Sequence, residues 1–204
     1  MQNRNSKFLT LILACLLTSS VTMAQTTSIG PMLGTNVTTL SNIPNAKYTP
    51  GLSVGGFLNH SVNENFGVNG KLLFSQFGTA YENSTFINRL NYIQLPISGV
   101  YYFGQAGDRV RPKIYAGVYA AALTNGADAD ANDIIGLSGQ TRFRDYDAGG
   151  QVGVGLNYRV QSRTWLNVDL GYTAGFVSVS ESPNENLRNQ GFNLNIGLSF
   201  PLSN

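Results

Sequence analysis

The sequence has little cysteine, histidine or charge. Its 204 residues include one cysteine and one histidine, and charged residues make up 12% of the chain. A single cysteine excludes an internal disulfide framework and a cysteine-based zinc site, and the lone His60 leaves few options for histidine-dependent catalysis. The formal net charge of +2 excludes a nucleic-acid binder that relies on a strong basic field. We therefore expect no enzymatic activity, no cofactor and no metal site.

Small and neutral polar residues take the place of the missing charge. An ordinary soluble domain is roughly 25% charged, yet hydrophobic residues make up only 42% of this chain and its mean hydropathy is −0.06. The difference is filled by 23 glycines and 22 asparagines. Disorder is excluded because 11 Phe and 10 Tyr, with regularly placed Leu and Val, supply enough apolar area for a stable fold.

Residues 1–24 have the pattern of a secretory signal peptide. Arg4 and Lys7 precede an apolar run at 8–17, and small residues end the segment at Ala24. The run is too short for a membrane-spanning helix, and no later stretch reaches the roughly 18 apolar residues that such a helix needs. We expect cleavage near Ala24, which leaves one domain at 25–204 and lowers the basic count from 13 to 11, equal to the acidic count.

Eight segments of the remaining chain alternate apolar residues with small or polar ones. The clearest runs from 192 to 200 (FNLNIGLSF), where every second residue is large and apolar. A period of two is that of a β-strand. We predict strands near 27–37, 50–62, 66–75, 93–103, 113–123, 151–159, 166–176 and 192–200.

The connections between these segments alternate in length. Short turns are expected at 63–65, 104–112 and 161–163, whereas the connections at 38–49, 79–89, 124–145 and 179–190 are longer and rich in Asn, Asp, Ser and Thr. In an antiparallel sheet, this alternation places the long loops at one end and the short turns at the other.

Whether the sheet lies in water or in a membrane decides which of its faces is inside. In a soluble eight-stranded barrel the apolar face fills the interior, which would leave an outer surface of Asn, Gly and Ser with few charges. In a membrane the apolar face meets lipid, and closure leaves no unpaired strand edge in hydrocarbon. We therefore predict an all-β fold, an eight-stranded antiparallel up-and-down transmembrane β-barrel, with the polar face packed inside as a hydrogen-bonded plug.

Aromatic and glycine positions fit this assignment. Outward aromatic residues near both ends would form two interfacial girdles, as in membrane barrels. They are Phe66, Tyr101, Phe103, Tyr158 and Phe200 near the short turns, and Phe176 and Phe192 near the long loops. Inward glycines at 153, 155, 171, 175 and 197 are interpreted as letting opposite walls approach, or equally as bends in a twisted sheet.

Several strand patterns resemble a known family. They are YIQLP at 92–96 running into YYF at 101–103, KIYAG at 113–117, the glycine-rich strand at 149–155 and the aromatic-ended last strand. Together they are similar to the PorT-type outer-membrane β-barrel domain of Gram-negative bacteria over roughly 27–204. The resemblance implies an integral outer-membrane location, contact with outer-membrane lipid, and insertion by the barrel-insertion machinery. It does not imply a role in protein secretion.

Five polar residues are expected to point into the lumen: Lys71, Gln94, Gln151, Arg159 and Asp169. Strands three and seven lie opposite one another in an eight-stranded barrel, so Lys71 and Asp169 pair if their depths match. We interpret the set as a network that holds the walls together, with a proton or solute path as the alternative, because eight strands leave little room.

The rims offer weaker candidates. Arg142 and Arg144 lie where the longest loop rejoins the barrel, and there they either contact lipid phosphates or pair with Asp145 and Asp147. Residues 128–132 match only part of a calcium loop. His60 falls at the rim of the short turns, away from the outer leaflet where a lipid hydrolase needs its base.

The leading hypothesis is a non-enzymatic outer-membrane barrel with a filled lumen, which acts in envelope structure or meets an extracellular partner through the loop at 124–145. One alternative is a narrow pore for small solutes. Another is a soluble periplasmic barrel that binds a ligand.

Overall fold

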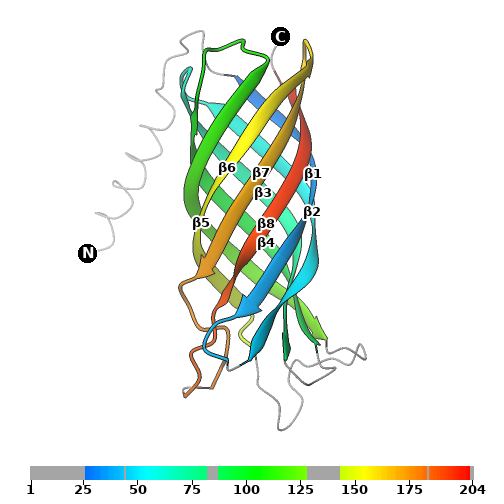
Figure 1. The fold of residues 1–204 in the computed structure, drawn as a ribbon, viewed down its shortest axis with the longest axis vertical. Coiled ribbons are helices and arrows are strands. Elements are labelled where there is room, and N and C mark those ends of the chain that lie inside the picture. The colour runs from blue at the N-terminus through cyan, green and yellow to red at the C-terminus, as the bar shows by residue number, and fades with distance from the viewer. Residues whose placement is uncertain (1–25, 44, 82–86, 128–142, 183, 203–204) are drawn as a thin grey trace, which may run out of the picture.

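Eight strands form one closed barrel (Figure 1). The computed structural model describes residues 26–43, 45–81, 87–127, 143–182 and 184–202. Each strand pairs antiparallel with the next, and β8 pairs with β1. The predicted eight-stranded antiparallel barrel is therefore confirmed. The strands are β1 (Thr27–Leu40), β2 (Ala46–Ser61), β3 (Phe66–Tyr81), β4 (Ile87–Tyr102), β5 (Val110–Ala127), β6 (Tyr146–Gln161), β7 (Thr164–Gly175) and β8 (Asn189–Pro201).

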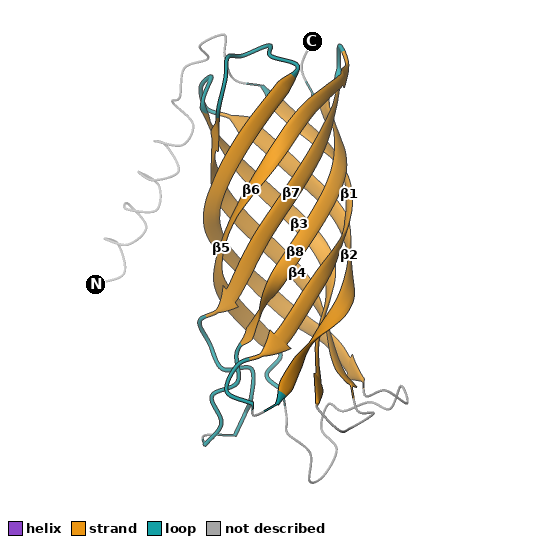
Figure 2. Cartoon of the chain, in the orientation of Figure 1, coloured by secondary structure: helices purple, strands orange, loops and turns teal. Residues whose placement is uncertain are grey.

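Every regular element in the described ranges is a strand (Figure 2). No helix among those residues is long and apolar enough to cross a membrane.

Several strands extend further toward the long loops than the alternation predicts. β1 continues to Leu40, β2 begins at Ala46, and β5 runs to Ala127. Alternation fails in the extension of β1, where Thr38, Thr39 and Leu40 are all buried. The strand continues there because the backbone ladder with β8 continues, as far as the pair Leu40 and Asn189. Backbone pairing therefore extends the strands beyond the side-chain pattern.

The short turns and the long loops lie at opposite ends of the barrel, as predicted (Figure 1). The short connections β2–β3, β4–β5 and β6–β7 gather at the upper end in that view, and the long ones at the lower end. Strands of 12–18 residues exceed the about 9–11 residues that cross hydrocarbon. The barrel is thus tall enough to project beyond a bilayer core.

The outer face is apolar, as the membrane assignment requires. Large side chains such as Leu33, Leu72 and Val118 are about three-fifths exposed, at 62%, 59% and 58%. Five of the seven predicted girdle residues are also exposed: Phe66, Phe103, Phe176, Phe192 and Phe200. The other two, Tyr101 and Tyr158, are half-buried; the Tyr101 ring packs edge-on against Phe66 and Phe103, with centroids 5.0 Å apart in each pair.

Inward glycines make room for aromatic rings from strands one or two positions away in the barrel. A Cβ on Gly153 would lie 2.4 Å from Tyr115 Cζ, and one on Gly171 would lie 2.3 Å from the Tyr115 hydroxyl. Gly149 and Gly197 leave space in the same way for the rings of Tyr119 and Phe57. The two sequence interpretations of these glycines, approach of opposite walls and sheet bends, missed this packing role.

We expect Gly153→Val to lower the free energy of unfolding by about 1–3 kcal/mol, because the added side chain collides with the Tyr115 ring and with the Leu170 carbonyl oxygen. Urea unfolding of the folded barrel measures the effect. Gly70→Val is the matched control, since a Cβ there has no heavy atom within 4 Å. If conflict with the ring contributes, Gly153→Val costs less in a Tyr115→Ala background; an unchanged cost would contradict the role of the ring and assign the loss to the Leu170 backbone.

Candidate functional site: the barrel interior

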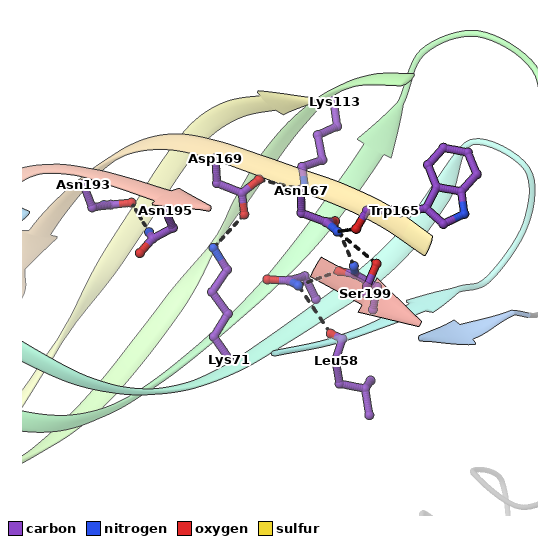
Figure 3. A network of polar contacts seen from close by, with 11 residues as sticks. Leu58, Lys71, Lys113, Trp165, Asn167, Asp169, Asn193, Asn195 and Ser199 are labelled. Atoms are coloured by element: carbon purple, nitrogen blue, oxygen red, sulfur yellow. Dashed lines mark hydrogen bonds and ion pairs between the residues drawn. The ribbon is translucent and has the colours of Figure 1, made fainter. Parts of the chain in front are cut away.

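One aspartate is shared by two lysines across the lumen (Figure 3). Lys71 Nζ on β3 lies 2.8 Å from Asp169 Oδ2 on β7, and Lys113 Nζ on β5 lies 2.7 Å from Asp169 Oδ1. All three side chains are at most 4% exposed. The structure thus brings Lys71 and Asp169 together at one depth and adds a second lysine. We call these three residues the lumen triad; its formal net charge is +1.

The triad ties three separate strands together. β3 and β7 lie opposite one another in the closed strand order, and β5 lies midway between them. Lys71 Nζ also lies 5.4 Å from the centroid of the Tyr115 ring. Burying a charge costs several kcal/mol unless it is paired. The shared carboxylate lies 2.8 and 2.7 Å from the two buried ammonium groups, so the contacts link the three strands.

An asparagine layer lies next to the triad, toward the short turns (Figure 3). Asn69 donates from Nδ2 to Asn59 Oδ1 at 2.6 Å, and Asn59 donates from Nδ2 to Asn167 Oδ1 at 3.3 Å. Asn167 in turn donates to Ser199 Oγ at 2.9 Å. The chain of bonds joins β3, β2, β7 and β8. The predicted polar plug is present at this level of the barrel.

Gln94 and Gln151 also lie inside, beside the triad. Ser75 Oγ donates to Gln94 Oε1 at 3.1 Å, and Gln151 Nε2 donates to Ser98 Oγ at 2.7 Å. Together with Lys71, both glutamines line a cavity of about 10 Å³. That volume is about one water-sized probe.

Arg159 lies apart from the other predicted lumen residues. It is half-buried near the short-turn end of β6, and its guanidinium lies 5.8 Å from the centroid of the Trp165 ring. Arg159 pairs with Trp165 in register, whereas Asp169 pairs with Gly155, four residues further along β6. At about 3.3 Å per residue, this separation is roughly 13 Å. The prediction that places Arg159 in one network with the triad is therefore wrong.

Two buried charged residues, Lys113 and Asp147, are not predicted by the sequence pattern. Lys113 was not singled out because alanine and glycine blur the alternation of β5, although outward Ile114 and Val118 imply that odd-numbered residues face inward. Asp147 was placed at the outer rim beside Arg144. It is in fact 1% exposed, and its Oδ2 accepts from the Tyr119 hydroxyl at 3.1 Å and from Asn189 Nδ2 at 2.9 Å.

An apolar cap closes the long-loop end of the barrel. Its buried members come from β1, β3, β4 and β5, and from the β5–β6 and β7–β8 connections. Phe143 forms a bridge to Ser180, which holds the two connections together. At this end apolar side chains pack beside the predicted polar plug, because the Tyr119 and Tyr92 hydroxyls bond to Asp147 and Asn189. The cap consists of Leu40, Phe77, Leu90, Tyr92, Tyr119, Ala121, Phe143, Val179 and Leu187.

The candidates at the long-loop rim are only partly described. Arg144 Nε donates to the Ser180 carbonyl oxygen at 3.1 Å, and its Nη1 donates to the Tyr146 hydroxyl at 3.5 Å. The suggested pairing with Asp147 is wrong, because that carboxylate points into the lumen. Arg142, the partial calcium pattern at 128–132 and most of the loop at 124–145 lie outside the described residues.

At the other end, His60 lies near the short turn of β2 and β3, as predicted, and its Nδ1 lies 2.9 Å from Thr27 Oγ1. Among the residues described, no group of three or more His, Cys, Asp or Glu residues is placed to hold a metal ion.

The two ends of the lumen differ in open space. At the short-turn end, a polar cavity of about 390 Å³ reaches in as far as Asn59 and Ser199. Beyond them come the triad, the 10 Å³ space and then the apolar cap. The lumen is therefore open at the short-turn end and narrow beside the triad, whereas at the long-loop end a cavity of about 350 Å³ lies among rim residues that include Asn42 and Arg188.

Comparison with known proteins gives a family and a fold. Residues 23–181 match the family described as outer membrane protein beta-barrel domain, whereas no curated protein matches the chain. Neisserial surface protein A is similar in structure, with a TM-score of 0.54, 15% identity, and coverage of 86% of this chain and 96% of that one. The outer membrane protein OprG from Pseudomonas aeruginosa gives a TM-score of 0.52 at 10% identity, covering 89% of this chain and 97% of that one. With a closed eight-stranded barrel and an apolar outer face, the chain belongs to the outer membrane protein beta-barrel domain family and is a protein of the outer membrane.

Proposed function

We propose that this protein is a non-enzymatic barrel with a side-chain-filled lumen, acting in envelope structure or in surface-loop interactions. The observation that carries the proposal is the filled interior. The triad and the apolar cap occupy successive levels, and the space of about 10 Å³ beside the triad is too small for a solute larger than water.

In this proposal the inward polar residues have a mechanical role. Lys71, Asp169 and Lys113 join β3, β7 and β5, while Gln151 reaches from β6 to Ser98 on β4. Such contacts run between strands that are not neighbours in the sheet, so they resist flattening of the barrel. The wall hydrogen bonds alone do not provide this resistance.

A narrow pore for small solutes is the second candidate, favoured by the polar and charged lining of the lumen. The soluble periplasmic ligand-binding barrel is dropped, because the chain belongs to an outer-membrane family and its outer face is apolar. The two remaining functions differ in whether ions cross the barrel.

Planar-bilayer recording separates them. We expect no steady conductance from the protein inserted in a lipid bilayer. The difference in gel mobility between boiled and unboiled samples shows that the same preparation is folded. Steady conductance that changes in Lys71→Ala or Asp169→Ala would establish a path through the lumen and overturn the proposal.

Finer features of the proposal concern targeting and the outer rim. We propose a signal peptide at 1–24 that is cleaved near Ala24, a barrel domain at 25–204 inserted by the barrel-insertion machinery, and membership of the PorT-type group. Arg142 and Arg144 are proposed to contact lipid phosphates, and the loop at 124–145 to meet an extracellular partner. Half-exposed Arg144 at the long-loop end supports the lipid contact.

A further inference from the structure

We propose that the cavity at the short-turn end is a binding site for a small periplasmic solute that carries an oxyanion, either a carboxylate or a phosphate. Short turns face the periplasm in outer-membrane barrels, so the cavity opens to that compartment. Its volume of about 390 Å³ falls in the range of small-molecule sites. Residues that line it include Ser28, Asn59, Glu64, Arg111, Trp165 and Ser199.

Arg111 supplies the positive charge of this cavity. Its guanidinium lies 5.0 Å from the centroid of the Tyr102 ring, and its Nη2 donates to the Glu64 carbonyl oxygen. Its Nε has no hydrogen-bond partner among the described residues. A guanidinium carries five N–H donors in a planar fork that fits carboxylate and phosphate. Arg111 is thus held by stacking and one bond, with donors left for a ligand.

The charged residues deeper in the lumen than the cavity are also net positive, like Arg111. Lys113 follows Arg111 by two residues and shares its inward face of β5. Lys113 and Lys71 share one carboxylate, Asp169, so the lumen triad has a formal net charge of +1. A cleft lined by one sign of charge and walled by low-dielectric material concentrates ions of the opposite sign. The Glu64 carboxylate lies on an exposed turn at the rim, so the positive charges lie deeper than the negative one.

The remaining lining suits the polar body of such a solute. Hydroxyls of Ser28, Ser61 and Ser199 and the amide of Asn59 line the cavity. The asparagine layer and the triad beneath it close the inner side. A solute that enters from the periplasm is therefore bound and not passed on, which makes this site independent of conduction.

Trp165 gives a direct readout, because it lines the cavity and is the only tryptophan in the chain. The experiment titrates the protein, extracted in detergent, with sodium citrate or with glycerol 3-phosphate, against sodium chloride at matched ionic strength. We expect a saturable change in Trp165 emission with at least one of the two oxyanions and none with chloride. A response to citrate alone assigns a carboxylate ligand, and a response to glycerol 3-phosphate alone assigns a phosphate.

Variants at the two ends of the barrel test the role of Arg111. Arg111→Gln is expected to weaken binding about tenfold or more, as expected for losing hydrogen bonds from a charged donor. Arg89→Gln, at an exposed arginine near the long-loop end of β4, is the matched control and leaves binding unchanged. Arg111→Lys keeps the positive charge but loses the planar set of guanidinium donors, so it is expected to bind more weakly than wild type. It is the test variant if Arg111→Gln does not fold.

If Trp165 emission does not change, calorimetry on the same samples shows whether the oxyanion binds. Heat on citrate or phosphate addition that saturates and is lost in Arg111→Gln supports the site. No saturable signal by either method, or equal affinity in wild type and Arg111→Gln of normal gel mobility, would overturn it.

Discussion

Asp169→Asn is expected to lower the free energy of unfolding by about 3–5 kcal/mol. The substitution leaves the ammonium groups of Lys71 and Lys113 buried in the lumen without the carboxylate that lies 2.8 and 2.7 Å from them. Removing one partner of a buried ion pair costs more than the pair contributes, because the remaining charge cannot be hydrated. Urea unfolding in lipid vesicles, followed by gel mobility, measures the loss.

Matched variants separate this charge effect from a general loss of structure. Asp145→Asn makes the same chemical change at an exposed position two residues before β6 residue Asp147, and is expected to change stability by less than about 0.5 kcal/mol. Adding Lys71→Met and Lys113→Met to Asp169→Asn removes all three charges and should restore much of the loss. Equal effects of Asp169→Asn and Asp145→Asn would show that the triad does not contribute to the free energy of unfolding.

Leu90→Ala is expected to lower the free energy of unfolding by about 2–5 kcal/mol. Leu90 is 1% exposed in the apolar cap, between the barrel wall and the connections that fold over it. The surrounding strands are fixed by their backbone ladders, so they cannot collapse into the space left by the missing carbons. The loss therefore includes a cavity cost in addition to the lost apolar burial.

The same substitution on the outer face of β4 is the control. Leu95 is 48% exposed and points away from the lumen. Lipid chains are as apolar as leucine and rearrange around a smaller side chain, so Leu95→Ala should cost less than Leu90→Ala in the same unfolding assay. A smaller loss for Leu90→Ala than for Leu95→Ala would mean that the cap is not a packed core.

The strand pattern could be predicted because it depends on local chemistry. Alternation in a segment such as 192–200 assigns one face to lipid, and the structure leaves Phe192, Leu194 and Leu198 exposed on that face. The ends of the strands were harder to predict, since near Leu40 the backbone ladder continues after the side-chain alternation stops.

The candidate site could be predicted only in part. The odd–even alternation of side chains along each strand places four of the predicted residues inside the lumen, where the structure also has them: Lys71, Gln94, Gln151 and Asp169. This alternation does not show which inward residues lie at the same depth along the barrel axis, because the stagger between strands sets that depth. For this reason Arg159 was grouped with residues that lie roughly four positions away along the strands, and the contact of Lys113 with Asp169 was not foreseen.

The number of strands, their antiparallel order and the face that meets lipid could all be predicted from the sequence. These follow from a period of two and from the alternation of short and long connections, both of which are properties of neighbouring residues. Which interior residues meet depends on how the barrel closes. The shared aspartate of the triad, the cap joined by Phe143 and Ser180, and the cavity around Arg111 each unite distant segments. Closing the sheet at a particular stagger sets those contacts, and no local pattern encodes the stagger.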